Sequence, residues 1–246
     1  MRKALAFLTP FGEPTGPTPG ALAWFPPVGA MIGFAVGGIW WLADKAWPAA
    51  AAAAVALASD VALTGYLHLD GLADAADGIL PPLEPDRRLA AMADPAVGAF
   101  GIVTVGVVLL LRFGALASTR SAPLVVASLW CGSRTAMAVI ARSLPYARPG
   151  GLAAAFLEDP GATNEGTLPA QRSPVVPALV GVVLSVCLAL AGRGLHALTA
   201  LGAEFLAAGA VALLSRRRIG GFTGDVLGAA GVIGETVGLL VLAARW

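Results

Sequence analysis

The chain has 246 residues, of which 57% are apolar and only 13% are charged, and its mean hydropathy is +0.79. A soluble domain is about a quarter charged, and a soluble protein of 24.6 kDa could not keep this much apolar surface away from water. The composition therefore excludes an ordinary soluble enzyme, a disordered chain and a coiled coil. The 16 basic and 15 acidic residues give a net charge of +1, which argues against nucleic acid as a partner. We expect a protein that crosses a lipid bilayer several times.

Seven apolar stretches approach the length of about 20 residues that a membrane-spanning helix needs. They cover residues 25–43, 49–67, 99–117, 123–142, 174–191, 195–214 and 228–244. The number falls to six if the alanine-rich stretch 49–67 is re-entrant. In the first stretch, Gly29, Gly33 and Gly37 recur every four residues, which favours close contact with another helix; the alternative is a kinked or half-inserted helix. We expect an all-α, polytopic integral membrane bundle that forms a single domain, 1–246.

The distribution of lysine and arginine predicts the orientation of the bundle. With a cytoplasmic N-terminus and seven spans, the inner segments hold ten basic residues and the outer segments hold four. The inner set is Arg2, Lys3, Arg87, Arg88, Arg142, Arg148, Arg172, Arg216, Arg217 and Arg218, and the outer set is Lys45, Arg120, Arg193 and Arg245. We therefore expect the N-terminus and the acidic segments described next to face the cytoplasm.

The segment 65–78 carries three carboxylates, Asp70, Asp74 and Asp77. Their i, i+4, i+7 spacing places them on one face of a helix, and Gly71 and Gly78 would let a bulky ligand approach the backbone. Three like charges on one face repel one another, so we expect a divalent cation to neutralise them. Carboxylate ligands suit Mg²⁺ or Mn²⁺ better than zinc. The segment predicts metal-assisted transfer of a phosphate group; the alternative is a solvated helix end.

Two later segments add candidates for the same site. Asp94 precedes the third expected span, although Asp-Pro also begins turns. The glycine-rich segment 220–229 enters the last span, and its backbone amides, including that of Gly224, could hold a phosphate at a helix start. Within it, Thr223 is a candidate helix cap or ligand, and Asp225 is a further candidate metal ligand.

Several polar residues fall inside the expected spans, where a charge is costly and is usually paired or functional. Arg134 could pair with Glu204 or Glu235, or it could reach a substrate phosphate. Asp60 and Arg112 raise the same question, and we expect both to belong to intramembrane polar pairs.

Two basic residues, His68 and Arg148, are further candidates for the site. His68 lies two residues before Asp70 and so points to another helix face, where it would act either as a general base or as an interfacial histidine bonded to the backbone or to an acid. Arg148, in the inner loop 143–173, is a candidate contact for phosphate.

Taken together and in order, these segments resemble the cobalamin synthase family, the adenosylcobinamide-GDP ribazoletransferases. The matching pieces are 7–9, 25–26 with Gly29, 68–78, Met92, Asp94, Gly98, Gly101, 133–134, 146–148 and 221–229. The stretches His-Leu-Asp-Gly-Leu-Ala-Asp-x-x-Asp-Gly and Thr-Gly-Asp-x-Leu-Gly-Ala are specific to that family. One departure lies at Asp94, where the family usually has a pattern like Met-x-Asp-Ser-Arg-x-Gly, so a phosphate-facing arginine is missing here. Either Arg87 or Arg88 substitutes for it, or the activity is altered.

The resemblance implies an enzyme of the bacterial inner membrane that joins adenosylcobinamide-GDP to α-ribazole, or to its 5′-phosphate, and releases GMP with the help of Mg²⁺. On this hypothesis Asp70, Asp74 and Asp77 hold the metal, and one of them, or His68, accepts the proton of the attacking hydroxyl. Two further acids, Asp94 and Asp225, would complete the shell. The expected substrate contacts are Arg134, Arg148, Gly71, Gly78, Thr223 and Gly224. The small-residue helix faces would also suit a homodimer.

Two alternative functions are also compatible with this composition and its acidic residues. A CDP-alcohol phosphotransferase also places acids and glycines at the cytoplasmic ends of its helices, but its pattern has an arginine where this chain has Asp74 after Ala73. A cation or metabolite transporter would use Asp60, Glu204 and Glu235 as its pathway. The densest acidic clusters nevertheless lie near one membrane face, which favours the transferase.

Overall fold

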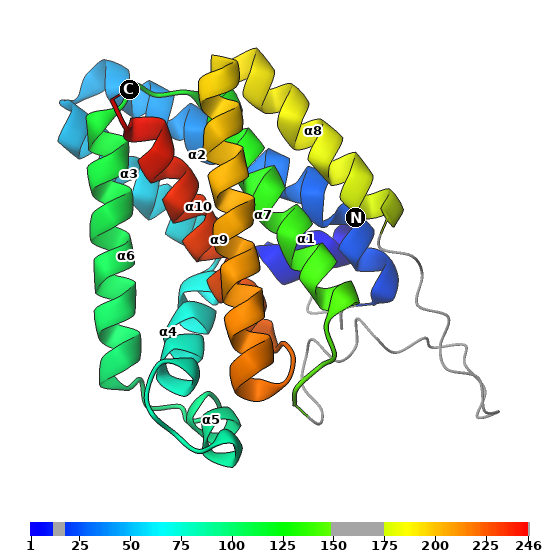
Figure 1. Cartoon of the computed structure of the whole chain (residues 1–246). Helices are drawn as coiled ribbons and strands as arrows, with labels where there is room; N and C mark the ends of the chain where they lie inside the picture. The colour runs from blue at the N-terminus through cyan, green and yellow to red at the C-terminus, as the bar shows by residue number, and fades with distance from the viewer. Residues whose placement is uncertain (12–17, 149–174, 246) are drawn as a thin grey trace.

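The structure is a computed structural model that describes residues 1–11, 18–148 and 175–245. Within these ranges it contains ten α-helices, one 3₁₀ helix and no β-strand, so the all-α prediction is confirmed (Figure 1). The elements are α1 (Arg2–Leu8), the 3₁₀ helix η1 (Pro19–Trp24), α2 (Phe25–Ala46), α3 (Ala49–Leu63), α4 (Leu67–Ile79), α5 (Pro85–Ala91), α6 (Ala99–Ser118), α7 (Pro123–Ser143), α8 (Val175–Arg193), α9 (Leu195–Ile219) and α10 (Gly224–Ala243).

Six of the described helical segments are long and apolar enough to cross a membrane. They are Gly20–Ala46, which joins η1 to α2, and the helices α6, α7, α8, α9 and α10. Each matches one of the expected spans, although residue 174 of the fifth span lies outside the described residues. The pair α3 and α4 could form a seventh span, but the two helices meet at an angle of 86°.

The break between α3 and α4 explains why the stretch 49–67 is not one straight span. After α3 ends at Leu63, Gly65 and Tyr66 both adopt positive φ angles, of 60° and 63°. Two successive left-handed residues cannot continue a right-handed helix, and Tyr66 lacks the freedom that glycine has in this conformation. The chain therefore turns sharply, and α4 starts in a new direction.

Helix α7 forms the centre of the bundle, with 89% of its most apolar stretch buried against 17% for α8. The glycines of α2 lie directly on it. A Cβ at Gly29 would collide with the Trp130 carbonyl, and one at Gly33 would lie 2.6 Å from the Val126 carbonyl oxygen. The expected close helix contact is confirmed because only glycine allows the two backbones to approach this far.

A buried ion network connects four helices inside the bundle. The Asp60 carboxylate on α3 lies 2.8 Å from Arg112 on α6, which lies 2.5 Å from Glu235 on α10. Glu235 also pairs with Arg134 on α7, and the Trp130 indole donates to Asp60 over 2.8 Å. The expectation that Asp60 and Arg112 belong to intramembrane polar pairs is confirmed, and the structure shows that they pair with each other. Of the two acids proposed for Arg134, the partner is Glu235.

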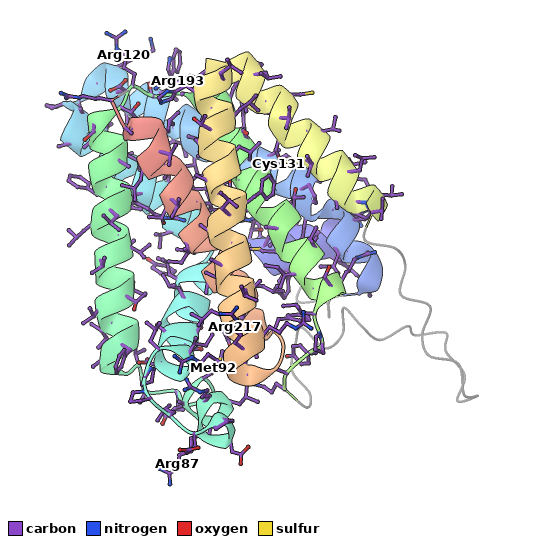
Figure 2. The ribbon with its side chains drawn as sticks, in the orientation of Figure 1. Arg87, Met92, Arg120, Cys131, Arg193 and Arg217 are labelled. Atoms are coloured by element: carbon purple, nitrogen blue, oxygen red, sulfur yellow. The ribbon has the colours of Figure 1, made fainter. Side chains whose placement is uncertain are left out.

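The two ends of the bundle carry different basic residues. Arg87 and Arg217, both from the set expected inside, lie toward the end that holds α4 and α5, whereas Arg120 and Arg193 lie at the opposite end (Figure 2). This separation agrees with the division made from the sequence. That the α4 end faces the cytoplasm stays a prediction.

Candidate active site

Helices α4 and α10 cross so closely that glycines are required at the crossing point. A Cβ at Gly71 would lie 3.0 Å from the Asp225 Cα atom, and one at Gly228 would lie 3.2 Å from the His68 carbonyl oxygen. The crossing brings the carboxylates of α4 beside Asp225, the first acidic residue of α10. Two acidic segments that are about 150 residues apart in the chain therefore meet at one end of the bundle.

Two backbone hydrogen bonds join the chain after α7 to the start of α10. The Ala147 amide donates to the Phe222 carbonyl and the Phe222 amide donates to the Pro145 carbonyl, each over 2.9 Å. A side chain at Gly221 would collide with the Pro145 carbonyl, so this position requires glycine. These hydrogen bonds place Arg148 beside the carboxylates at the crossing of α4 and α10.

Asp225 is held from two sides. Its Oδ2 atom accepts a hydrogen bond from the Thr223 hydroxyl over 3.2 Å and lies 3.4 Å from the Arg148 guanidinium. Thr223 also caps α10, because its hydroxyl accepts from the Val226 amide over 3.3 Å. The N-terminal end of a helix favours negative charge, so an anionic group is stabilised here next to Arg148. The prediction that Thr223 caps the helix is confirmed.

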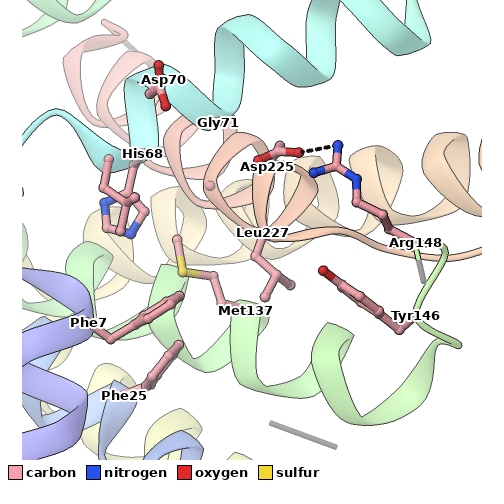
Figure 3. A pocket seen from close by; sticks show the side chains of 13 residues that line it. Phe7, Phe25, His68, Asp70, Gly71, Met137, Tyr146, Arg148, Asp225 and Leu227 are labelled. Atoms are coloured by element: carbon pink, nitrogen blue, oxygen red, sulfur yellow. Dashed lines mark hydrogen bonds and ion pairs between the residues drawn. The ribbon is translucent and has the colours of Figure 1, made fainter. Parts of the chain in front are cut away.

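A cavity of about 290 Å³ opens beneath this crossing (Figure 3). Its lining residues are Phe7, Phe25, Leu67, His68, Asp70, Gly71, Met137, Tyr146, Arg148, Gly224, Asp225, Leu227 and Gly228. In Figure 3, Asp70, Asp225 and Arg148 lie along one side of the cavity, and Phe7, Phe25 and Met137 lie along the other. The cavity therefore has a charged rim and an apolar floor.

Negative charge dominates the rim. Asp70 and Asp225 line the cavity. Asp74 is half-buried and is not a lining residue, but the carboxylates of Asp225 and Asp70 are both near enough to repel its carboxylate. Arg148 is the cation that acts on Asp74 and Asp225. One guanidinium does not balance three carboxylates, so the rim attracts a further cation.

The carboxylates do not form a closed metal cage. Across residues 1–11, 18–148 and 175–245, no three His, Cys, Asp or Glu side chains are grouped closely enough to bind one ion by themselves. The donor set nevertheless fits Mg²⁺, which usually keeps several waters and binds through one or two carboxylates and the substrate's phosphates. Asp70, Asp74 and Asp225 are the carboxylates placed to contribute.

Tyr146 offers a neutral polar group at the cavity wall. Partial burial raises the pKa of the Tyr146 phenol above its ordinary value; Arg148 opposes this shift and Asp225 adds to it. The phenol therefore keeps its proton at neutral pH and is able to donate a hydrogen bond.

Three residues predicted at the site have other structural roles. Asp77 accepts hydrogen bonds from the amides of Gly98 and Gly101, over 2.7 Å and 2.9 Å, and so caps the start of α6. Asp94 is exposed and accepts from the Ala96 amide in a local turn, over 2.9 Å. Gly78 packs against α5, where a side chain would collide with Met92. The structure therefore does not bring Asp77, Asp94 and Gly78 to the cavity wall.

Of the arginines predicted to contact phosphate, one lines the cavity and the others lie elsewhere. Arg148 lines the cavity, whereas Arg134 is 1% exposed and belongs to the buried ion network. Arg88 donates to the carbonyls of Gly78 and Ile79 at the end of α4, over 3.0 Å and 2.9 Å. All of these bonds use Nη1 and give Arg88 a structural role at the end of α4. Neither Arg87 nor Arg88 lines the cavity, and that one of them replaces a phosphate-facing arginine stays a prediction.

The sequence missed part of the cavity floor. Met137 on α7 and Leu227 on α10 are buried apolar residues that line it beside His68. No pattern in the sequence distinguishes them from the other apolar residues of their helices, because only the packing of α7 against α10 turns them toward the cavity.

Comparison with known proteins gives a consistent result over nearly the whole chain. The family described as "Cobalamin-5-phosphate synthase" matches residues 1–243. A Stutzerimonas stutzeri protein named adenosylcobinamide-GDP ribazoletransferase is 41% identical over 240 residues, which is 92% of this chain and 90% of the relative. Proteins of the same name from Pseudomonas paraeruginosa and Chlorobium phaeobacteroides are 37% and 35% identical, over 98% and 88% of this chain and 96% and 85% of the relatives. No solved structure matches the chain.

Proposed function

Because this chain belongs to the cobalamin-5-phosphate synthase family, we propose that it is a transferase of cobalamin synthesis that joins adenosylcobinamide-GDP to α-ribazole and releases GMP. The proposal includes the 5′-phosphate of α-ribazole as an alternative acceptor. The observation that carries it is the cavity at the crossing of α4 and α10, with acidic residues and an arginine at its rim. We also propose that the site faces the cytoplasm from the inner membrane of a bacterium.

The reaction forms one bond to phosphorus and breaks another. A ribose hydroxyl of α-ribazole attacks the phosphorus that carries the corrinoid arm, the anhydride bond to the second phosphorus breaks, and GMP leaves with the electron pair. The hydroxyl proton passes to a carboxylate at the rim, for which Asp70 and Asp74 are the candidates. Arg148 and the start of α10 face the anionic phosphates and hold them in position.

Asp70 and Asp225 at the rim, with Asp74 next to them, are the residues that would hold Mg²⁺ or Mn²⁺. When bound, the metal supplies positive charge that neutralises the diphosphate and the leaving GMP. The excess of carboxylates over Arg148 supports this assignment, because without a cation the rim would repel an anionic substrate.

The structure gives less support to the rival functions. The cavity beside Asp60 and Arg112 measures only about 10 Å³, which leaves room for no more than one water molecule. A transporter would need a continuous polar pathway past these residues, but both side chains are tied into the ion network instead. The acidic segment also lacks the arginine expected of a CDP-alcohol phosphotransferase.

The direct test measures GMP release by the purified full-length protein in proteoliposomes. With adenosylcobinamide-GDP, α-ribazole and Mg²⁺, we expect GMP and adenosylcobalamin in equal amounts, and no CMP from a CDP-linked lipid. Asp74→Asn should reduce the rate by at least about a hundredfold, whereas Asp86→Asn, which changes an exposed carboxylate of α5, should not. A folded Asp74→Asn protein that works at the normal rate would refute the mechanism, and CMP release would refute the substrate assignment.

A further inference from the structure

The size of the cavity limits which part of the substrates it can hold. Its volume of about 290 Å³ is at the lower limit of ligand pockets, which span roughly 300–1,000 Å³. A corrinoid linked to a nucleotide is far larger than this. The cavity therefore admits one compact group, while the corrinoid stays outside.

The floor of the cavity favours a flat apolar group. Phe7 and Phe25 stack on each other with ring centroids 5.8 Å apart, and Met137 and Leu227 complete the apolar surface. Aromatic rings and a methionine thioether both pack well against another aromatic ring. An aromatic base fits this surface better than a ribose or a phosphate does.

One polar atom in the floor lacks a partner. His68 is 6% exposed and lines the cavity, and Figure 3 shows its imidazole ring on the same side as Phe7 and Met137. Within the described part of the chain, the buried Nδ1 atom has no hydrogen-bond partner. Leaving a buried polar atom unpaired costs free energy, so a ligand that supplies one matching atom would be favoured here.

The two substrates of the proposed reaction differ in how well they match an apolar floor whose nearby polar groups are the His68 imidazole and the Tyr146 phenol. The guanine of adenosylcobinamide-GDP carries more donors and acceptors on its edge than His68 and Tyr146 can pair, so on this floor it would bury polar atoms without partners. The dimethylbenzimidazole of α-ribazole carries two methyl groups and a single free ring nitrogen. We infer that the cavity binds the benzimidazole base of the acceptor, with His68 Nδ1–H donating to that nitrogen; this inference rests on the proposed function.

This placement gives His68 a binding role. The base lies on the apolar floor, so the attached ribose extends toward Asp70, Asp225 and Arg148 at the rim, where the phosphates lie. His68 thereby determines which acceptor binds and how it is oriented, and a rim carboxylate accepts the proton.

The first test uses the unmodified protein and a changed acceptor. In the riboside of dimethylindole, a C–H group replaces the free ring nitrogen. We expect its KM to be about tenfold higher than that of α-ribazole, the effect of one lost hydrogen bond that leaves a buried donor unpaired, with kcat little changed. Free dimethylbenzimidazole should compete with α-ribazole and not with adenosylcobinamide-GDP.

The second test changes His68 itself. His68→Phe should raise the KM for α-ribazole about tenfold and abolish the preference for α-ribazole over the indole riboside, while the KM for adenosylcobinamide-GDP stays the same. The matched control is His196→Phe, because His196 lies at the start of α9 and does not line the cavity. It should leave both KM values unchanged.

The outcomes separate the inference from the proposed function. If the unmodified protein releases no GMP, the proposed function fails. If it releases GMP but both ribosides have equal KM values, or the free base competes with adenosylcobinamide-GDP, the base-binding inference is overturned. A His68→Phe protein with a normal KM, a strongly reduced kcat and an altered pH profile would instead make His68 the general base. The analogue series decides the question even if His68→Phe does not fold.

Discussion

The buried ion network allows a sharp prediction about stability, because one carboxylate in it serves two arginines. Glu235 accepts hydrogen bonds from Arg112 over 2.5 Å, from Arg134, and from the Ser133 hydroxyl over 2.7 Å. With Asp60, it balances the charges of the two arginines. Glu235→Gln keeps the size of the side chain but removes its charge, so the network is left with one uncompensated arginine.

The expected cost follows from the burial of the network. Removing one partner of a buried ion pair typically costs about 3–5 kcal/mol, because the remaining charge stays desolvated. Arg112, Arg134 and Glu235 are all at most 2% exposed, so water cannot replace the lost carboxylate. At about 1.4 kcal/mol per factor of ten, the folding equilibrium of Glu235→Gln should fall by roughly two to three and a half orders of magnitude. Loss of a neutral hydrogen bond alone would cost only about 1 kcal/mol.

Glu204 provides the matched control. It is a glutamate of a neighbouring spanning helix, α9, and it is 0% exposed, but neither of its carboxyl oxygens has a hydrogen-bond partner in the described part of the chain. The network is already neutral without it. Glu204→Gln makes the same chemical change without breaking a pair, so it should change the free energy of unfolding by less than about 1 kcal/mol.

Both variants are measured by SDS titration of the purified protein in mixed micelles, with helicity followed by circular dichroism. The difference in free energy of unfolding between Glu235→Gln and the unmodified protein should be at least about three times that of Glu204→Gln. Equal losses in the two variants would show that burial of any carboxyl group, and not its pairing, determines stability, and the charge-balance argument would then be wrong.

Two further predictions follow from the packing of the helices, and a third follows from the distribution of basic residues. Asp77→Ala should lower the free energy of unfolding by about 2 kcal/mol, because it removes the cap of α6; loss of GMP release from protein that remains folded would instead make Asp77 a site residue. Gly33→Ala should destabilise the protein by about 1–3 kcal/mol, because its Cβ would lie 2.6 Å from a carbonyl oxygen of α7. Gly38→Ala is the control: outside its own helix backbone no atom lies within 4 Å of its Cβ, so it should be neutral or slightly stabilising in the same titration. Arg87→Cys, at the α4 end of the bundle, should react in spheroplasts with a membrane-impermeant maleimide only after the inner membrane is permeabilised. Labelling of Arg87→Cys in intact spheroplasts would refute the prediction that this end faces the cytoplasm.

The fold class, the approximate spans and the position of the acidic segments could all be predicted from the sequence alone. Hydropathy over about 20 residues and the spacing of residues on one helix are local properties, so they can be obtained without tertiary structure. The same reasoning predicted that Asp60 and Arg112 are paired inside the membrane, because a charge within a span needs a partner. That the two pair with each other is known only from the structure. The glycines of the first span also predicted a close helix contact that the structure contains.

Which of the polar residues form the site depends on how the helices pack, and the sequence could not predict it. Asp70 and Asp77 belong to one helix, yet Asp70 lines the cavity and Asp77 caps α6, through amides 21 and 24 residues later in the chain. Asp225 meets Arg148 across 77 residues, and the floor around His68 comes from four different helices, α1, α2, α7 and α10. The role of a carboxylate or an imidazole depends on which groups reach it through space. In a bundle, the crossing of helices determines those neighbours, and the spacing along the chain does not.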